Sequence, residues 1–215
     1  MARLTVDISS SLDGYVAGPD SSLEDPLGVG GERLHEWAFA ASSWQDRHGH
    51  EGGEAGSDSD VLQEHIDAIG ASIMGRKMFS GGAGPWEDDP KARGWWGDDP
   101  PFHHPVFVLT HHAREPLEME GGTTFTFVTE GIEAAVEQAR AAAGGKDVHV
   151  AGGAEAAQQY LRAGLVDTLQ IHVAPELLGS GRRLLDDLGD SPPGLELDRV
   201  VASPGVTHLR YRVAA

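Results

Sequence analysis

The sequence contains no cysteine, and this absence removes several kinds of chemistry at once. Disulfide bonds, cysteine-ligated zinc, thiol nucleophiles and the cysteine-containing signature of zinc deaminases are all excluded. The absence leaves the redox compartment undetermined, because a chain without thiols fits an oxidising or a reducing environment.

Basic residues are also scarce: 16 Lys and Arg stand against 34 Asp and Glu, and the formal net charge is −18. Binding to nucleic acid or to an anionic membrane depends on a basic surface, so the sequence predicts neither partner. An anionic small molecule would need a pocket that is locally basic.

Long apolar runs are missing, and the first ten residues lack a basic region followed by an apolar one. We therefore expect no membrane span and no targeting signal, and a cytoplasmic location. The 215 residues are enough for one substantial core, and no composition shift marks a boundary, so we expect a single domain over residues 1–215.

The stretch DVHVAGGAEAAQQYL, from Asp147 to Leu161, has the clearest pattern for a ligand site. An apolar run precedes the pair Gly152 and Gly153 and a helix-compatible segment follows it, which predicts a strand, a tight turn and a helix. Glycines let the backbone approach a ligand closely, and the N–H groups at a helix start favour an anion. A glycine turn without a ligand fits equally well, because the full dinucleotide-binding fingerprint is absent.

Strand and helix patterns alternate along the rest of the chain. Apolar alternation and short apolar runs predict strands at 3–10, 71–75, 105–110, 123–129 and 166–174. Helical spacing predicts helices at 32–45, 60–69 and 132–143. The tail adds two strand-like runs around a Pro-Gly turn, so the sequence predicts an α/β fold that ends in an antiparallel hairpin.

Two short polar segments follow predicted strands, where ligands bind in open α/β sheets. Arg76 and Lys77 come directly after Gly75, and in an acidic chain this basic pair is a candidate for phosphate binding. Thr110 ends another predicted strand, His111 comes directly after it, and both are candidates for contact with a phosphate or a ribose. Solvated surface side chains are the alternative explanation for both pairs.

Two long segments look like loops. Residues 45–60 are rich in glycine and acids and lack periodic hydrophobics, so we expect a flexible surface insertion. His48 and His50 lie in this insertion, where histidines are usually solvated, so we predict no metal site. The loop 80–105 is rich in Trp, Gly and Pro, and its aromatic anchors predict an ordered segment that lines or covers a pocket.

Two further loops have glycines and turn signals that suit a ligand. Residues 11–20 contain Asp-Gly and Gly-Pro turns around a small apolar patch, which fits a cover over a ligand or an ordinary connection. Residues 176–183 contain Gly179, Gly181, Arg182 and Arg183, which fit close approach to an anion or a solvated basic turn.

Five segments, in chain order, carry a family resemblance: SLDGYVAGPD at 11–20, IMGRKMF at 73–79, VFVLTHH at 106–112, VHVAGGAEAAQQYL at 148–161 and VDTLQIHVAPELLGSGRRLL at 166–185. Together they resemble the RibD C-terminal family, the reductase domain of bacterial riboflavin biosynthesis, over nearly the whole chain. The resemblance implies a dihydrofolate reductase-like, three-layer α/β/α fold with a mostly parallel central sheet and a C-terminal antiparallel hairpin. It also implies NADPH as cofactor and a homodimer.

The resemblance further implies a cofactor site built from separate turns. Arg76 is the best candidate for the extra phosphate of NADPH. The implied cofactor-binding residues are Val16 and Ala17 near the nicotinamide, Gly75, Arg76 and Lys77 at the phosphates, Thr110 and His111 on the adenosine side, and Gly152, Gly153, Ala154 and Glu155 at the pyrophosphate.

The resemblance says less about the substrate and the catalytic acid. In the riboflavin reductases the loop that corresponds to 177–183 lies near the substrate, so Gly179, Gly181 and Arg182 are candidates for binding a sugar phosphate. No motif identifies a proton donor, and Asp13 and Glu36 are the acidic candidates. The insertion at 45–60 and the Trp-rich loop depart from the family pattern, and we expect them to reshape this side of the pocket.

The leading prediction is an NADPH-dependent reductase that transfers hydride to a C=N or C=O bond of a small heterocyclic or ribosylamine substrate. It would be similar to 5-amino-6-(5-phosphoribosylamino)uracil reductase. The nicotinamide would carry the chemistry, and the protein would supply binding and orientation. The alternatives are a dihydrofolate reductase-like enzyme with another substrate, a nucleotide-binding module without turnover, and a ligand-binding protein that takes no nucleotide.

Overall fold

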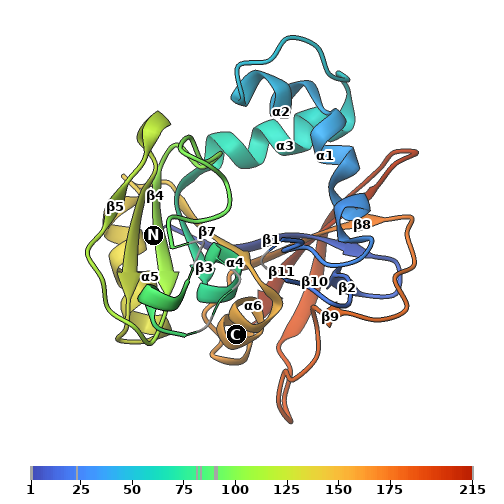
Figure 1. Cartoon of the computed structure of the whole chain (residues 1–215). Coiled ribbons are helices and arrows are strands. Elements are labelled where there is room, and N and C mark those ends of the chain that lie inside the picture. Colours follow the sequence, from blue (N-terminus) through green and yellow to red (C-terminus); the bar gives the residue numbers. More distant parts are fainter. Residues whose placement is uncertain (1, 23, 81, 83, 90–91, 215) are drawn as a thin grey trace.

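A computed structural model describes residues 2–22, 24–80, 82, 84–89 and 92–214. Its main feature is a nine-stranded sheet with the order β10-β11-β8-β1-β7-β3-β4-β6-β5 (Figure 1). The strands from β8 to β6 in this order pair in parallel, as predicted. These parallel strands are β1 (Leu4–Ser11), β3 (Ile69–Gly75), β4 (Pro105–Leu109), β6 (Thr124–Val128), β7 (Asp147–Gly152) and β8 (Thr168–Ala174).

The two edges of the sheet are antiparallel. The predicted terminal hairpin is confirmed as β10 (Gly194–Ala202) and β11 (Thr207–Ala214), and β11 pairs with β8. The short strand β5 (Leu117–Glu118) closes the other edge against β6. A separate two-stranded sheet joins β2 (Tyr15–Ala17) to β9 (Arg182–Arg183).

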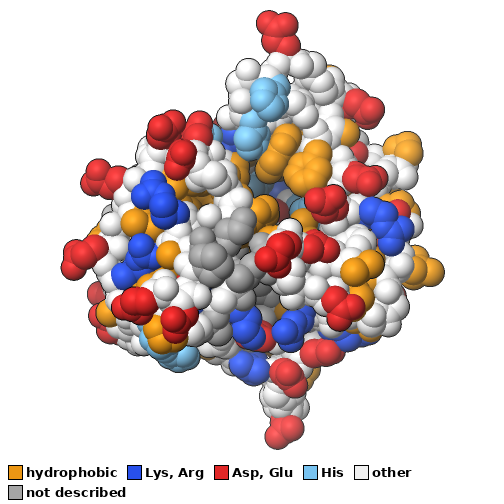
Figure 2. All heavy atoms as spheres, in the orientation of Figure 1, with side chains coloured by type: hydrophobic (Ala, Val, Ile, Leu, Met, Phe, Trp, Pro, Cys, Tyr) orange, Lys and Arg blue, Asp and Glu red, His pale blue; other side chains and the backbone are white. Residues whose placement is uncertain are grey.

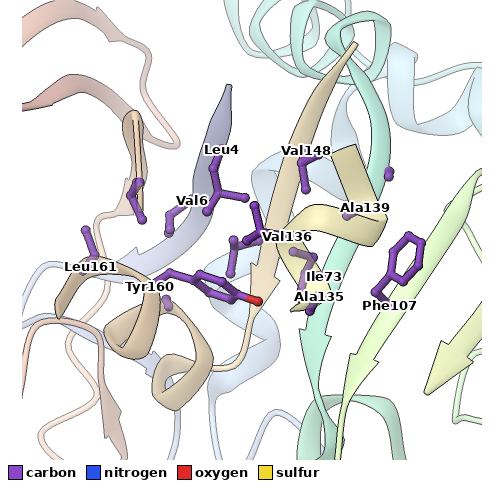
Figure 3. Close-up of a cluster of buried hydrophobic side chains, with 14 of the residues drawn as sticks. Leu4, Val6, Ile73, Phe107, Ala135, Val136, Ala139, Val148, Tyr160 and Leu161 are labelled. Carbon is purple, nitrogen blue, oxygen red and sulfur yellow. The ribbon is translucent and has the colours of Figure 1, made fainter. Parts of the chain in front are cut away.

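One face of the main sheet is apolar and packs on helices α5 (Ile132–Ala142) and α6 (Ala154–Arg162). Alternate residues of the strands point to this face because side chains alternate along a strand. Figure 3 shows Leu4, Val6, Ile73 and Val148 of the sheet meeting side chains of α5 and α6. Tyr160 is fully buried here and donates a hydrogen bond to the carbonyl oxygen of Ile132 over 3.2 Å.

The opposite face has an apolar part and a polar part. Over β4 and β6 it carries valines and phenylalanines, Val106, Val108, Phe125 and Phe127. They pack against α4 (Arg76–Ser80) and the Trp-rich loop, which includes the short 3-10 helix η2 (Trp86–Asp88). Over β1, β8 and β11 it carries polar side chains beneath α1 (Glu36–Ala40) and α3 (Ser57–Ala68). The remaining short elements are η1 (Gly31–His35), α2 (Ser42–Arg47) and η3 (Glu120–Gly122).

The prediction of one continuous helix over 32–45 is wrong. The chain forms η1, α1 and α2 instead, and Ala41 between the two α-helices is extended, with φ −67° and ψ 138°. The break has a partner in the chain that follows, because Glu54 N donates to Ala40 O and Ser42 N donates to Glu54 O. This backbone pairing replaces helical hydrogen bonds that a continuous helix would have made.

The segment 45–60 is more regular than we predicted. Helix α2 continues to Arg47 and α3 begins at Ser57, so helix occupies both ends of the segment. Ser59 fixes α3 to α2, since its hydroxyl accepts a hydrogen bond from Ser43 N over 3.0 Å. Flexibility of the residues in between stays a prediction.

Candidate cofactor and substrate site

The structure brings the predicted cofactor turns together at the carboxyl ends of the central strands. In the parallel pairing Met74 lies opposite Gly152, and Gly75 lies opposite Leu109. The carboxyl ends of β3, β4 and β7 are therefore neighbours, which is the position of ligand sites in open α/β sheets. Gly75 itself packs on the glycine pair, because a Cβ added to it would lie 4.0 Å from Gly153 N.

The glycine pair leaves room above the start of α6. Gly152 has a φ of 115°, which disfavours any side chain, and its peptide bond with Gly153 is cis. Among the described residues, a Cβ added to Gly153 would meet nothing within 4 Å. Helix α6 begins at the next residue, Ala154, and none of the side chains that the structure describes caps its N-terminus. Gly152 is buried and Gly153 is exposed, so an open backbone position directly precedes a helix N-terminus, which suits a pyrophosphate.

Arg76 points away from this turn and into the protein. Its side chain is 7% exposed, and Nη2 lies 2.6 Å from Oδ2 of Asp89, whose side chain is 3% exposed. The guanidinium also donates to Ser80 Oγ and lies 3.6 Å from the centre of the Trp86 ring. In this structure Arg76 therefore anchors the Trp-rich loop, and its charge is already paired.

The exposed cations at the start of α6 are Lys77 and Arg182. Lys77 Nζ lies 3.2 Å from Glu155 Oε1, and Arg182 Nη1 lies 3.8 Å from the same oxygen. All three side chains are more than half exposed, so these ion pairs are open to exchange with a ligand. Figure 2 shows Lys and Arg side chains gathered over α6 and β9.

Thr110 and His111 differ in their surroundings. Thr110 is 8% exposed, and its hydroxyl accepts a hydrogen bond from His112 N over 3.1 Å, so it shapes the turn after β4. His111 is exposed at the same turn. Trp86 Nε1 donates a hydrogen bond to His112 O over 2.7 Å, which attaches the Trp-rich loop to the turn after β4.

The first loop and the predicted substrate loop pack on each other. Strand β2 pairs with β9, which places Ala17 beside Arg182. Gly181 lies so close to the first loop that an added Cβ would be 2.1 Å from Ala17 O. Val16 is buried in the core next to them, with 7% of its surface exposed. The residues that the resemblance places near the nicotinamide and near the substrate are therefore adjacent.

Asp13 holds these two loops together. Its carboxylate accepts hydrogen bonds from Ser11 Oγ over 2.6 Å, Gly179 N over 2.7 Å and Leu178 N over 3.1 Å. The Ser11 hydroxyl is the main cause that lowers the pKa of Asp13 to about 2, and the loop amides add to it. A carboxylate with this pKa has no proton to give at neutral pH, so the geometry favours a structural role. The other acidic candidate, Glu36, is exposed on α1.

A small cavity opens beside the paired loops. It has a volume of about 120 Å³, and its lining includes Ser10, Gly14, Ile171, Arg183 and Asp186. The Arg183 guanidinium lies 5.0 Å from the centre of the Tyr15 ring and 3.3 Å from Asp186 Oδ1. The cavity combines apolar walls with a cation, which suits part of a small anionic molecule.

Sequence reasoning missed a polar network between the sheet and α3. Asp7 Oδ1 lies 2.8 Å from His172 Nε2, and Asp7 Oδ2 lies 3.2 Å from His65 Nδ1. His172 continues the chain, with Nδ1 2.6 Å from His208 Nδ1. Burial opposes the charge of Asp7, but the two neighbouring histidines outweigh it and hold the pKa of Asp7 well below its usual value.

A signal for this network is present in β1. Leu4, Val6 and Ile8 fill the apolar face, and the alternate residues Thr5 and Asp7 are polar. An acid on the covered face of a central strand requires a partner. The partners His65, His172 and His208 lie far away in the sequence, on α3, β8 and β11, so the spacing of the residues does not identify them.

The fold agrees with comparisons to known proteins. The sequence pattern of the RibD C-terminal domain matches residues 2–209. The chain therefore belongs to the RibD C-terminal domain family. No match is found among curated proteins.

Solved structures show the same fold. A riboflavin biosynthesis protein from Shewanella sp. PV-4 aligns with a TM-score of 0.61 at 20% identity, over 100% of both chains. RibD of Acinetobacter baumannii aligns with a TM-score of 0.60 at 17% identity, over 100% of this chain and 59% of its own.

A third similar structure is described as a diaminohydroxyphosphoribosylaminopyrimidine deaminase/5-amino-6-(5-phosphoribosylamino)uracil reductase, from Thermotoga maritima. It aligns with a TM-score of 0.52 at 13% identity, over 99% of this chain and 57% of its own. The present chain thus spans the whole of the Shewanella protein and less than 60% of the Acinetobacter and Thermotoga proteins.

Within the described residues, no helix is long and apolar enough to cross a membrane.

Proposed function

We propose that the protein is an NADPH-dependent reductase that acts on a phosphorylated ribosylamino-pyrimidine or a closely similar heterocycle. The observation that carries this proposal is the family match over residues 2–209, which includes every strand end of the candidate site. The description of the Thermotoga relative as a 5-amino-6-(5-phosphoribosylamino)uracil reductase supports the substrate class.

The pyrophosphate of the cofactor would lie on the turn formed by Gly152 and Gly153. The open space above Gly153 and the N–H groups at the start of α6 support this position. Gly75 would border the same turn, and Thr110 and His111 would lie on the adenosine side. The nicotinamide supplies the hydride when it is bound. Val16 and Ala17 would then border it from the first loop.

The extra phosphate of NADPH would be held by Lys77 rather than by Arg76. Of Arg76 and Lys77, Lys77 has its charge at the surface, and its ion-pair partner Glu155 is also exposed. Arg76 is paired with buried Asp89. A phosphate would replace Glu155 as the partner of Lys77, and such an exchange between exposed charges costs little.

The substrate would lie where the first loop meets the loop 177–183. Gly179 and Gly181 keep the backbone of the second loop close to Asp13 and Ala17, and Arg182 follows at its end. Arg182 and Arg183 would hold the sugar phosphate, since a guanidinium matches a phosphate in shape and charge. The cavity beside Arg183 would take part of the substrate.

The test is oxidation of NADPH in the presence of 5-amino-6-(5-phosphoribosylamino)uracil, followed by the loss of nicotinamide absorbance. We expect turnover with the phosphorylated compound and a higher KM with its dephosphorylated form. Arg182→Ala should raise the KM for the phosphorylated compound and leave the KM for the dephosphorylated form unchanged. NADPH binding without turnover on any ribosylamino-pyrimidine would instead indicate a nucleotide-binding module.

Lys146 provides a matched control for the cofactor contact. It is exposed and directly precedes β7, so it lies at the other end of this strand from Gly152. Lys77→Ala should weaken NADPH more than NADH, and Lys146→Ala should weaken neither. Equal loss of NADPH and NADH affinity in Lys77→Ala would refute the contact with the extra phosphate.

We also propose a homodimer, with β10 at the interface. This strand forms one edge of the main sheet, and Leu195, Leu197 and Val200 on it are 44%, 57% and 50% exposed. An edge strand with exposed apolar side chains is a favourable surface for pairing with a second chain.

A further inference from the structure

Beneath α3, the sheet presents an acid and several histidines that the proposed reductase chemistry does not use. Asp7 comes from β1, His149 from β7 and His65 from α3. One side-chain donor atom of each lies within 4.8 Å of those of the other two. All three residues are partly or largely buried, so the cluster belongs to the interior between the sheet and the helix.

The contact between Asp7 and His65 has the geometry of two ligands around one ion. Asp7 Oδ2 and His65 Nδ1 are 3.2 Å apart and form an ion pair, but the contact lacks the geometry of a hydrogen bond, so this buried oxygen has no hydrogen-bond donor among the described residues. Ligand atoms about 2.0–2.1 Å from a tetrahedral ion are separated by about 3.3 Å. A buried carboxylate oxygen without a hydrogen bond is costly in a native protein, and a cation would satisfy it.

The groups behind these ligands are placed as they are in metal sites. Asp7 Oδ1 accepts a hydrogen bond from His172 Nε2 over 2.8 Å, which fixes the carboxylate and leaves Oδ2 free for an ion. His149 Nε2 lies 3.1 Å from Asp7 O, and an N–H that donates there leaves the lone pair on Nδ1. Ligating carboxylates and histidines are commonly held by such second hydrogen bonds.

We propose that Asp7, His65 and His149 form a binding site for a divalent transition-metal ion. Two imidazole nitrogens and one carboxylate oxygen match Zn²⁺ best, and Co²⁺ is a spectroscopic substitute for it. Three protein ligands leave a position for water. The ion joins α3 to β1 and β7, so it stabilises the attachment of the helix to the sheet.

The experiment begins with protein that has been treated with a chelator and dialysed. Calorimetric titration with ZnCl₂ should give one equivalent of saturable binding, and CoCl₂ should give the visible absorption of a four- or five-coordinate ion. His65→Gln is the first variant, because its side chain is 17% exposed and lies on α3. We expect this variant to bind Zn²⁺ at least about tenfold more weakly.

Two comparisons separate this site from other histidines and from misfolding. The double variant His48→Gln/His50→Gln removes a pair in the 45–60 segment and should bind Zn²⁺ like the wild type. In chelator, His65→Gln should fold but melt below the wild type, because Asp7 loses a partner. Zn²⁺ should then raise only the melting temperature of the wild type. X-ray absorption of the wild-type zinc complex needs no variant and should show two imidazole ligands.

The proposal is overturned if the folded wild type shows no saturable binding of Zn²⁺ or Co²⁺. It is also overturned if His65→Gln keeps wild-type affinity, or if the His48/His50 double variant loses binding. Fewer than two imidazole ligands in the X-ray absorption spectrum would contradict it as well. None of these results depends on turnover, so the metal site and the proposed reductase activity are tested separately.

Discussion

Replacing Arg76 with alanine should destabilise the protein rather than act selectively on NADPH. The Arg76 side chain is 7% exposed, and Nη2 lies 2.6 Å from Oδ2 of Asp89. The same guanidinium lies 3.6 Å from the centre of the Trp86 ring. The substitution removes both contacts and takes from the buried Asp89 carboxylate a guanidinium that lies 2.6 Å away.

The size of the effect follows from this burial. Removing one partner of a buried ion pair costs about 3–5 kcal/mol, because the remaining charge is poorly solvated. For a chain of this size, 1 kcal/mol corresponds to roughly 2–4 °C in Tm. We therefore expect Arg76→Ala to lower Tm by about 6–20 °C. The double variant Arg76→Met/Asp89→Leu should recover much of the loss, since it removes the charge that remained.

The assay is thermal and urea denaturation of Arg76→Ala and of Lys77→Ala, together with NADPH and NADH titrations below both transitions. Lys77 is exposed, so its variant should change the free energy of unfolding by less than about 0.5 kcal/mol. The reasoning is refuted if Arg76→Ala melts like the wild type and loses affinity for NADPH much more than for NADH. That result would show that Arg76 turns outward to the extra phosphate of the cofactor.

Three further predictions concern the loops, a buried histidine and the sheet edge. Gly181→Ala places a Cβ 2.1 Å from Ala17 O at a φ of 130°, so it should cost roughly 1–3 kcal/mol or more in denaturation and raise the substrate KM; an unchanged melting curve would contradict the loop contact. Burial lowers the pKa of His104 to about 3, so below pH 6.5 this histidine binds a proton in the unfolded chain and stays neutral in the folded chain. The free energy of unfolding therefore falls as pH drops from 6.5 towards 3. His104→Gln should therefore lose roughly 2–3 kcal/mol less than the wild type between pH 6.5 and 4.5 in urea titrations, and equal losses would speak against this role. Leu197, 57% exposed on β10, should contribute to the dimer, so Leu197→Asp should give a monomer by light scattering, and an unchanged mass would exclude this interface.

The order of the strands and helices could be predicted from the sequence because local patterns dictate them. The second strand-like run of the tail became β11, and the apolar run in 105–110 became β4 with boundaries within one residue. The helix over 32–45 could not be predicted correctly, because its break at Ala41 depends on backbone hydrogen bonds with Glu54. The spacing of apolar residues, from which the helix was predicted, contains no information about that backbone contact.

The candidate site was predictable where it depends on the backbone. Gly75 and Gly152 are the last residues of β3 and β7, Gly153 follows β7, and parallel pairing brings the ends of those strands together. The direction of a long side chain was not predictable from the sequence. Arg76 points inward because it pairs with buried Asp89, which lies further along the chain in the Trp-rich loop, while its neighbour Lys77 faces solvent. The Asp7 network was missed for a related reason, since its histidines come from distant strands and a helix.

The measurement that tests the central claim most directly is a titration of the purified protein with NADPH and with NADH, followed by nicotinamide fluorescence and by quenching of tryptophan fluorescence. A pyridine-nucleotide site at the carboxyl ends of β3, β4 and β7 predicts saturable, micromolar or tighter binding of NADPH, with weaker binding of NADH. Absence of binding to both nucleotides would contradict the reductase account and leave the fold as the scaffold for another ligand.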